Sequence, residues 1–174
     1  GDLFPQNPEQ WQDSDGDGYG DNLEGAGADA FPDDPTQWND TDSDGYGDNP
    51  SPAYQPDGCP DVNGFSTKDR FGCLDSDFDK YSDPSPDWTI AQGADAIPND
   101  ITQWIDRDGD GYGENLSGNN PDSCPLTFGT SMYTWQADLT SSSGYSKTSM
   151  YGCVDSDGDN WADSSDAFPN DPLE

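Results

Sequence analysis

Apolar residues are scattered along this chain and follow neither of the periods that mark regular secondary structure. No segment repeats apolar residues every 3.6 positions over the length of a helix. Glycine and proline, which occur 20 and 15 times, interrupt every candidate element. We therefore predict mostly irregular structure of short turns, with a few strand pairs of about two to four residues and no helix longer than about two turns. Segments 131–136 and 145–151 are candidates for a short hairpin.

The charge of the chain changes this picture, because so acidic a composition is typical of disorder. Lysine and arginine number 5 against 37 aspartates and glutamates, the formal charge is −32, and only 29% of residues are hydrophobic. So little apolar surface cannot offset the conformational entropy that a chain loses on folding. The acids are nevertheless spaced rather than clustered, and glycines and aromatic residues keep fixed places among them. Their spacing indicates a structure that is organised by something other than an apolar core.

An Asp-x-Asp-x-Asp pattern recurs five times, and the loops that it defines are numbered here from their first aspartate: Asp13 (loop 1), Asp40 (loop 2), Asp75 (loop 3), Asp106 (loop 4) and Asp155 (loop 5). Acids stand at positions 1, 3, 5 and 9 of each loop. This is the spacing of calcium-binding loops, in which alternate side chains turn inward and position 7 offers its carbonyl oxygen. Two carboxylates about 4 Å apart repel by roughly 4 kcal/mol at a protein surface. We therefore expect five or more calcium ions, whose binding energy becomes folding energy.

The predicted ligands are the same in each loop. Side chains at positions 1, 3 and 5 are Asp13, Asp15, Asp17, Asp40, Asp42, Asp44, Asp75, Asp77, Asp79, Asp106, Asp108, Asp110, Asp155, Asp157 and Asp159. Position 7 contributes the carbonyl oxygens of Tyr19, Tyr46, Tyr81, Tyr112 and Trp161. Position 9, bound directly or through water, is Asp21, Asp48, Asp83, Glu114 and Asp163. Position 12 is Glu24 in loop 1 and Asp166 in loop 5.

Position 6 of such a loop needs a sharp turn, which glycine or asparagine tolerates. Gly18 fills it in loop 1 and Asn160 in loop 5, but loop 3 has Lys80 there. Because Lys80 lacks glycine's freedom and adds a positive charge, loop 3 is predicted to bind calcium most weakly. The Pro- and Gly-rich flanks exclude EF-hands, which need an amphipathic helix on each side of the loop.

A second motif alternates with the loops, at residues 4–11, 31–38, 97–104 and 168–172. An aspartate or asparagine before proline favours a helix start, so we expect one short helical turn in each copy. Each turn would place its tryptophan on the tyrosine of a neighbouring loop, as part of a small aromatic cluster. Carbohydrate stacking is the alternative role for these rings.

The two motifs combine into larger units. Residues 31–96 and 97–167 are copies of one unit, residues 1–30 are a shortened copy, and residues 168–174 begin another. Cysteines allow three pairings, and the repeat favours Cys59–Cys73 and Cys124–Cys153, one bond inside each unit. Units that contact mainly their neighbours form a rod. Residues 127 to 145 are a Ser- and Thr-rich insertion in the second unit.

These loops, together with Asp57-Gly58-Cys59-Pro60 and Asp122-Ser123-Cys124-Pro125, resemble thrombospondin type 3 repeats, especially those of prokaryotic surface proteins. The resemblance covers nearly the whole chain. It implies a chain without a regular core, wrapped around a row of calcium ions, that serves in extracellular structure and adhesion. It also implies that Asp57 and Asp122 fill position 12 of loops 2 and 4.

We therefore expect an extracellular structural protein: a segment or subunit of a calcium-stabilised fibre or surface stalk that contacts copies of itself head to tail. Disulfides persist in oxidising compartments, and Asn39 and Asn115 begin glycosylation sequons. The alternative is an adhesin module that binds carbohydrate or protein on a cell surface. An enzyme is not expected, since there is no histidine or nucleophile motif, and no catalytic residue is predicted. Nor do we expect nucleic-acid binding or, without an apolar run of about 20 residues, membrane insertion.

Overall fold

The computed structural model describes residues 1–138 and 140–173, which are mainly turns, bends and coil. The chain divides into two compact units, Gly1–Asp83 and Pro84–Glu174. This boundary falls inside the predicted repeat unit 31–96, whose limits were set by sequence alone. Within the first unit lie loops 1 to 3, and within the second lie loops 4 and 5.

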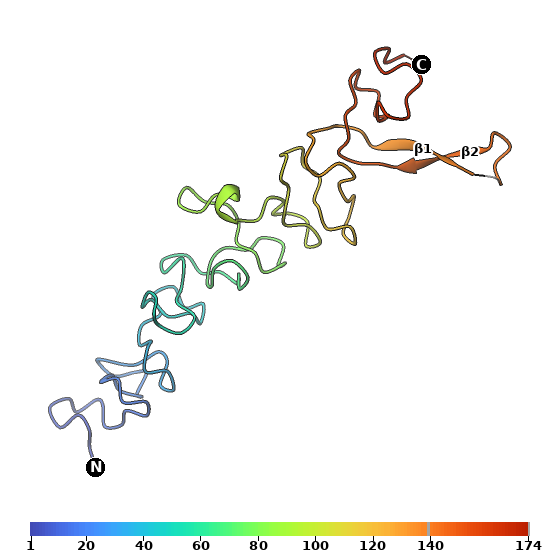
Figure 1. Ribbon diagram of the computed structural model, residues 1–174. Coiled ribbons are helices and arrows are strands. Elements are labelled where there is room, and N and C mark those ends of the chain that lie inside the picture. Colours follow the sequence, from blue (N-terminus) through green and yellow to red (C-terminus); the bar gives the residue numbers. More distant parts are fainter. Residues whose placement is uncertain (139, 174) are drawn as a thin grey trace. The chain divides into compact units, whose positions relative to one another are not determined.

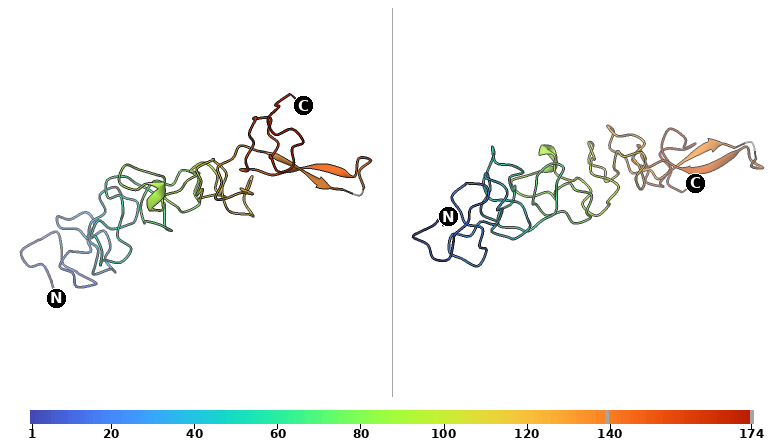
Figure 2. Two further views of the ribbon diagram at one scale, coloured as in Figure 1. Left: turned by 45° about the horizontal axis from the view of Figure 1, so that its top comes forward. Right: turned by 90° about the horizontal axis from the view of Figure 1, so that it is seen from below.

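Regular elements are few among the described residues, as predicted. A 3-10 helix, η1, spans Ile90–Gln92, and two strands, β1 (Tyr133–Ala137) and β2 (Tyr145–Ser149), pair antiparallel (Figure 1). Figure 2 shows the same hairpin from two further directions. The expected hairpin is thus confirmed, and its strands have five residues each. Elsewhere in residues 1–138 and 140–173, β-pairing is limited to isolated bridges, such as the one between Gly20 and Ala28.

The predicted helical turn of residues 4–11 is instead a pair of successive β-turns. The amide of Asn7 donates to the carbonyl of Phe4 at 2.8 Å, and the amide of Gln10 donates to the carbonyl of Asn7 at 3.1 Å. Each turn carries a proline at its second position, where its fixed φ suits the turn. Pro8 disfavours helical backbone at the preceding residue, Asn7, which helps to keep these two turns apart. Residues 31–38 and 97–104 repeat both turns.

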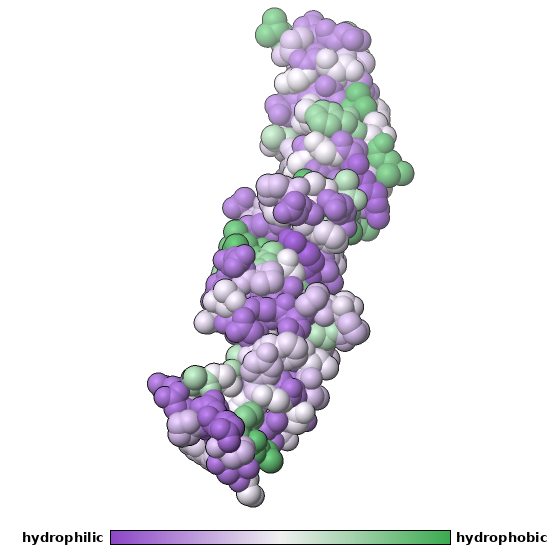
Figure 3. All heavy atoms as spheres, turned by 90° about the vertical axis from the view of Figure 1, so that its left-hand side faces the viewer, coloured by the Kyte–Doolittle hydropathy of each residue, from purple (hydrophilic) through white to green (hydrophobic). Residues whose placement is uncertain are grey.

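The buried side chains of this protein are mostly polar. The buried hydrophobic residues are small: Cys73, Ala94, Cys153 and Ala162. The largest fully buried side chains are three glutamines, Gln10, Gln37 and Gln103. On the face drawn in Figure 3, apolar residues form separate patches among hydrophilic ones. Burial of apolar area therefore contributes little to this fold compared with that of an ordinary domain.

Both predicted disulfides are confirmed, with Cα–Cα distances of 5.1 Å in Cys59–Cys73 and in Cys124–Cys153. The two segments are supported alike. The fully buried Ser66 and Ser131 hydroxyls accept the amides of Cys73 and Cys153, each at 3.0 Å. This shared construction holds although the cysteines are 14 residues apart in one unit and 29 in the other.

Candidate metal centres

In each of the five loops the structure brings the carboxylates of positions 1, 3 and 5 together. The three carboxylate oxygens of each set, one per aspartate, lie within 4.8 Å of one another. The sets are Asp13, Asp15 and Asp17; Asp40, Asp42 and Asp44; Asp75, Asp77 and Asp79; Asp106, Asp108 and Asp110; and Asp155, Asp157 and Asp159. Each set is therefore a candidate metal site.

The first aspartate of each loop holds the turn together. In loop 1 the Asp13 carboxylate accepts the amides of Gly16 at 2.7 Å and Gly18 at 3.1 Å. These amides can reach it because positions 4 and 6 both have left-handed backbone, with φ of 86° at Gly16 and 100° at Gly18. The same two bonds recur in all five loops. The need at position 6 was predicted from the sequence, whereas the need at position 4 was not.

Loop 3 meets this backbone requirement without glycine. Its positions 4 and 6 are Phe78, with φ 67°, and Lys80, with φ 85°. Left-handed backbone costs a residue with a side chain roughly 1–2 kcal/mol. The cost at Phe78 adds to the one expected at Lys80, and is a further reason to expect the weakest binding at loop 3.

The residue at position 7 joins loops 1, 2, 4 and 5 to an aromatic neighbour. The amide of Tyr19 donates to the carboxylate of Asp17 at 2.8 Å. The Tyr19 ring stacks on Trp38 with 5.0 Å between centroids, as predicted for this motif. In other loops the partner differs, and Trp161 stacks at 4.6 Å on Trp135 of the insertion.

Position 9 acids serve mainly as clamps in this structure. The carboxylate of Asp21 accepts both the amide and the hydroxyl of Ser14, at 2.9 and 2.6 Å. Asp48, Asp83 and Asp163 make the same pair of bonds to position 2. In loop 4, Glu114 accepts the amide of Arg107 at 3.1 Å and pairs with its guanidinium instead of a hydroxyl. The residue at position 2 was missed by sequence reasoning. These clamps favour binding through water over direct ligation at position 9.

A further aspartate closes four of the loops, and in loop 1 it is not the residue predicted. Asp29 is 1% exposed, its amide donates to the carbonyl of Gly20 at 2.9 Å, and its Oδ1 accepts the amide of Phe31 at 2.7 Å. Glu24, the predicted position 12 acid of loop 1, is exposed. The same two bonds are made by Asp57, Asp122 and Asp166. The signal for Asp29 was present in the sequence as an aspartate two residues before Phe31, matching Asp57 before Cys59.

Burial and mutual repulsion dominate the electrostatics of these carboxylates. Burial, followed by repulsion from the loop aspartates, raises the pKa of Asp29, Asp57 and Asp122 from 3.8 to about 6. Burial and neighbouring carboxylates also raise the pKa of Asp79 to about 6. One buried oxygen in each of Asp17, Asp29, Asp57 and Asp157 accepts no hydrogen bond from the described part of the chain.

These donors fit a hard divalent cation. Such ions take several oxygen ligands, chiefly carboxylates and carbonyls, and the buried oxygens without hydrogen bonds can face them. Loop 1 would hold the ion with Asp13, Asp15, Asp17, the Tyr19 carbonyl and Asp29. The absence of histidine from the sequence and of free cysteine from the structure makes zinc a poor match.

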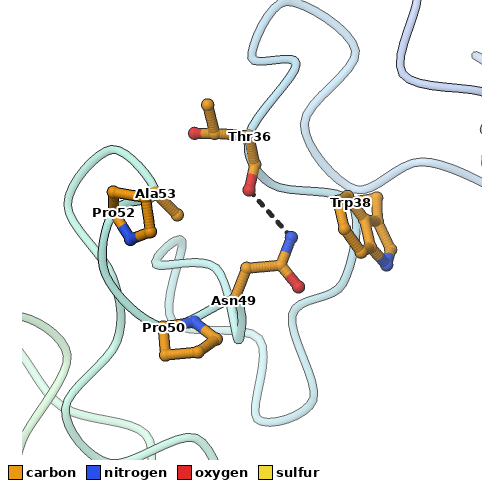
Figure 4. Close-up of a pocket in the computed structure, with 6 residues that line it drawn as sticks. All are labelled: Thr36, Trp38, Asn49, Pro50, Pro52 and Ala53. Atoms are coloured by element: carbon orange, nitrogen blue, oxygen red, sulfur yellow. Dashed lines mark hydrogen bonds between the residues drawn. The ribbon is translucent and has the colours of Figure 1, made fainter.

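A buried glutamine fastens loops 1, 2 and 4 to the preceding double turn. The Gln37 amide group accepts the Asn49 amide at 2.9 Å and donates to the Asn49 carbonyl at 3.1 Å, as a peptide group would. Asn49 in turn donates its side-chain amide to the carbonyl of Thr36 at 2.8 Å, beside Trp38 (Figure 4). We call this arrangement the Gln–Asn clasp; Gln10 with Asn22 and Gln103 with Asn115 form it too.

The clasp explains glycine at position 8 of these loops. A Cβ on Gly47 would lie 2.2 Å from Oε1 of Gln37. Loops 3 and 5, which have no such glutamine, carry Ser82 and Ala162 at position 8. The glutamine of the second motif was noticed in the sequence as a repeat, without a role.

The two sequons differ in how their asparagines are used. Asn39 is exposed, and its amide nitrogen donates to Asp48 at 2.6 Å. Asn115 is half-buried in a Gln–Asn clasp, where its side chain donates to the Thr102 carbonyl at 2.8 Å. Glycosylation at both residues stays a prediction.

No protein-family model and no curated protein matches this chain. Across residues 1–138 and 140–173, none of the helices has the length and apolar character to cross a bilayer.

Proposed function

We propose that this chain is an extracellular structural calcium-binding repeat protein, a segment or subunit of a calcium-stabilised fibre or surface stalk. One observation carries the proposal. Five sets of aspartates converge in a chain whose buried hydrophobic residues, over the described range, are two half-cystines and two alanines. A fold that buries several acids, among them Asp29, Asp57 and Asp122, and exposes its larger apolar residues needs cations to be stable.

Calcium is the proposed cation because of the number and kind of the donors. Each loop offers three aspartates and a carbonyl, and four loops add a closing aspartate. Calcium accepts six to eight oxygens in flexible geometry, whereas magnesium demands an octahedron and keeps several waters. Calcium at millimolar concentration suits open loops of this kind, since extracellular modules bind it with dissociation constants of about 10⁻⁴–10⁻³ M.

The extracellular location is supported by both disulfides, which persist in oxidising compartments. A structural role is supported by the recurrence of one local construction, since loops, clasps and closing acids repeat with the same partners. In a repeat protein each such unit contacts mainly its neighbours, so copies can extend into a rod. Association of copies head to tail is part of the same proposal.

Electron microscopy and sedimentation, with calcium and after chelation, test this proposal. Thin filaments or an extended particle are expected in calcium, with loss of that form in EDTA. A compact particle in calcium that keeps its sedimentation coefficient in EDTA would contradict it. Magnesium at the same concentration serves as the control for ionic strength, and is expected not to restore the extended form.

A further inference from the structure

The insertion in the repeat 97–167 carries a surface that has no counterpart in the repeat 31–96. The repeats 31–96 and 97–167 each close a disulfide near a buried serine, but only the second has the β1–β2 hairpin between its cysteines. On this hairpin Trp135 is 50% exposed and Tyr145 is 58% exposed. Aromatic side chains left half in water on an added element suggest a binding surface rather than packing.

The register of the hairpin puts these rings on one face. Trp135 pairs with Lys147 and Ala137 pairs with Tyr145, so all four side chains point to the same side of the sheet. Trp135 and Tyr145 are diagonal neighbours, at a separation that aromatic rings span. A hollow of about 400 Å³ is lined by Trp135, Ser143, Tyr145 and Ser165.

Trp135 is held in place before any ligand arrives. It stacks on Trp161 with ring planes 15° apart, and the Ala162 amide donates to the carbonyl of Tyr133 at 3.0 Å. One face of the Trp135 ring is thus covered, although half of the side chain remains exposed. A ring that is fixed in advance loses little entropy when a ligand binds to it.

The chemistry of the hollow selects the class of ligand. The Lys147 ammonium lies 3.1 Å from the centroid of Tyr133, so its charge is directed to that ring. With a formal charge of −32, the chain repels anions. The Ser143 hydroxyl donates to the Tyr145 carbonyl at 2.9 Å and the Ser165 hydroxyl to that of Ala162 at 3.2 Å. Both serine oxygens keep lone pairs that can accept from ligand hydroxyls.

We propose that Trp135 and Tyr145 form a binding site for a neutral saccharide. The C–H face of a pyranose ring would lie against an aromatic ring, and its hydroxyls would donate to Ser143 and Ser165. The volume is suited to one or two sugar rings, at the lower end of ordinary ligand pockets. The hairpin would bind sugar whether or not the chain forms a fibre.

Isothermal titration of the whole chain in millimolar calcium, with neutral hexasaccharides of glucose, mannose, xylose and N-acetylglucosamine, tests the site. We expect at least one to bind with a dissociation constant of the order of a millimolar. Trp135→Ala should weaken that binding by at least about tenfold and Tyr145→Ala by about fivefold. Trp11→Ala is the matched control, because Trp11 is 56% exposed and belongs to the compact unit Gly1–Asp83. This substitution should leave the affinity unchanged.

Near-UV circular dichroism of each variant checks that the fold is kept, and Tyr145→Ala, away from the stack on Trp161, remains informative if Trp135→Ala unfolds. No binding by any of the four saccharides would overturn the site, as would equal losses in Trp135→Ala and Trp11→Ala. Binding confined to sulfated saccharides would contradict a neutral ligand. Self-association that Trp135→Ala abolishes, without sugar binding, would make the face a contact between copies. Electron micrographs of the same samples test the fibre proposal separately, so that absence of saccharide binding is distinguished from absence of fibres.

Discussion

Loops 1, 2 and 4 and loops 3 and 5 present the same aspartate set on two different supports. The first three are fastened by a buried glutamine, through the Gln–Asn clasp. The other two begin two residues after a disulfide cysteine. In each, the carbonyl at position 6 accepts two successive backbone amides from the chain between the paired cysteines: Thr67 and Lys68 donate to Lys80, and Met132 and Tyr133 donate to Asn160. The aspartates and their turns are alike in both groups, so the loop geometry does not depend on which support is used.

The comparison also shows that a support restricts which residue can stand at a position distant from it in the sequence. Position 8 is glycine where a glutamine lies against it, and is serine or alanine where none does. A fold without a large core thus relies on local polar contacts, each of which must be satisfied. The two supports are expected to fail in different ways when they are altered.

The largest effect is expected from removal of a clasp. Gln37→Ala deletes both bonds to the Asn49 backbone and leaves buried polar groups without partners, which should lower the free energy of unfolding in calcium by about 2–3 kcal/mol. Thermal unfolding followed by circular dichroism measures this. Gln6→Ala, at an exposed glutamine, should change stability by less than about 0.5 kcal/mol. Equal effects of the two substitutions would show that the clasp is not a support.

Removal of a closing acid should affect one ion. Asp29→Asn keeps the bond to the Phe31 amide but removes the charge, and should weaken calcium binding at loop 1 by at least about tenfold. Glu24→Gln, at the exposed acid, should weaken it by less than about twofold. Calorimetric titration of the two variants separates these residues. The reverse order of effects would return position 12 to Glu24.

A smaller gain is expected in loop 3. Lys80→Gly removes the cost of left-handed backbone and a positive charge, and should strengthen calcium binding there by about fivefold. The mirrored change, Gly111→Lys in loop 4, should weaken its loop by a similar factor. If neither substitution alters the affinity of its loop, position 6 does not limit binding in either group.

The smallest effect concerns pH and has opposite signs with and without calcium. Burial raises the pKa of Asp29, Asp57 and Asp122 to about 6 in the folded chain, above the ordinary 3.8. Without metal, the folded chain binds more protons than the unfolded chain between these values, so its stability should rise as pH falls through 6. With calcium the same protonation competes with the ion, so affinity should fall over that range. Near-UV circular dichroism in EDTA at pH 7.5 and 5 measures the fraction of chain that stays folded, and calorimetric titration at the same pH values measures the calcium affinity. A change of both in the same direction would contradict the account.

Much of this construction could be predicted from the sequence. The scarcity of helix, the hairpin, both disulfides and the convergence of the aspartates followed from spacing and repetition, because each is a local or repeated feature. The prediction of helical turns was wrong because each motif forms two separate β-turns. Pro8 helps to keep the turns of residues 4–11 apart, but residues 97–104 form the same turns with Ile101 at that place. The role of Gln37 could not be predicted, since a glutamine that acts as a peptide group to a residue 12 positions away leaves no periodic signal. Asp29 was missed because the prediction counted to position 12 of loop 1, which is Glu24, whereas the closing acid lies further along the chain.

Native mass spectrometry of the intact chain, titrated with calcium and then with EDTA, tests the central claim most directly. At least five bound ions are predicted at millimolar calcium, one for each set of aspartates. Removal of the ions should shift the charge-state distribution toward that of an unfolded chain, because cations hold a fold with so little apolar burial. Fewer than four specific ions, or a distribution unchanged by EDTA, would contradict the account.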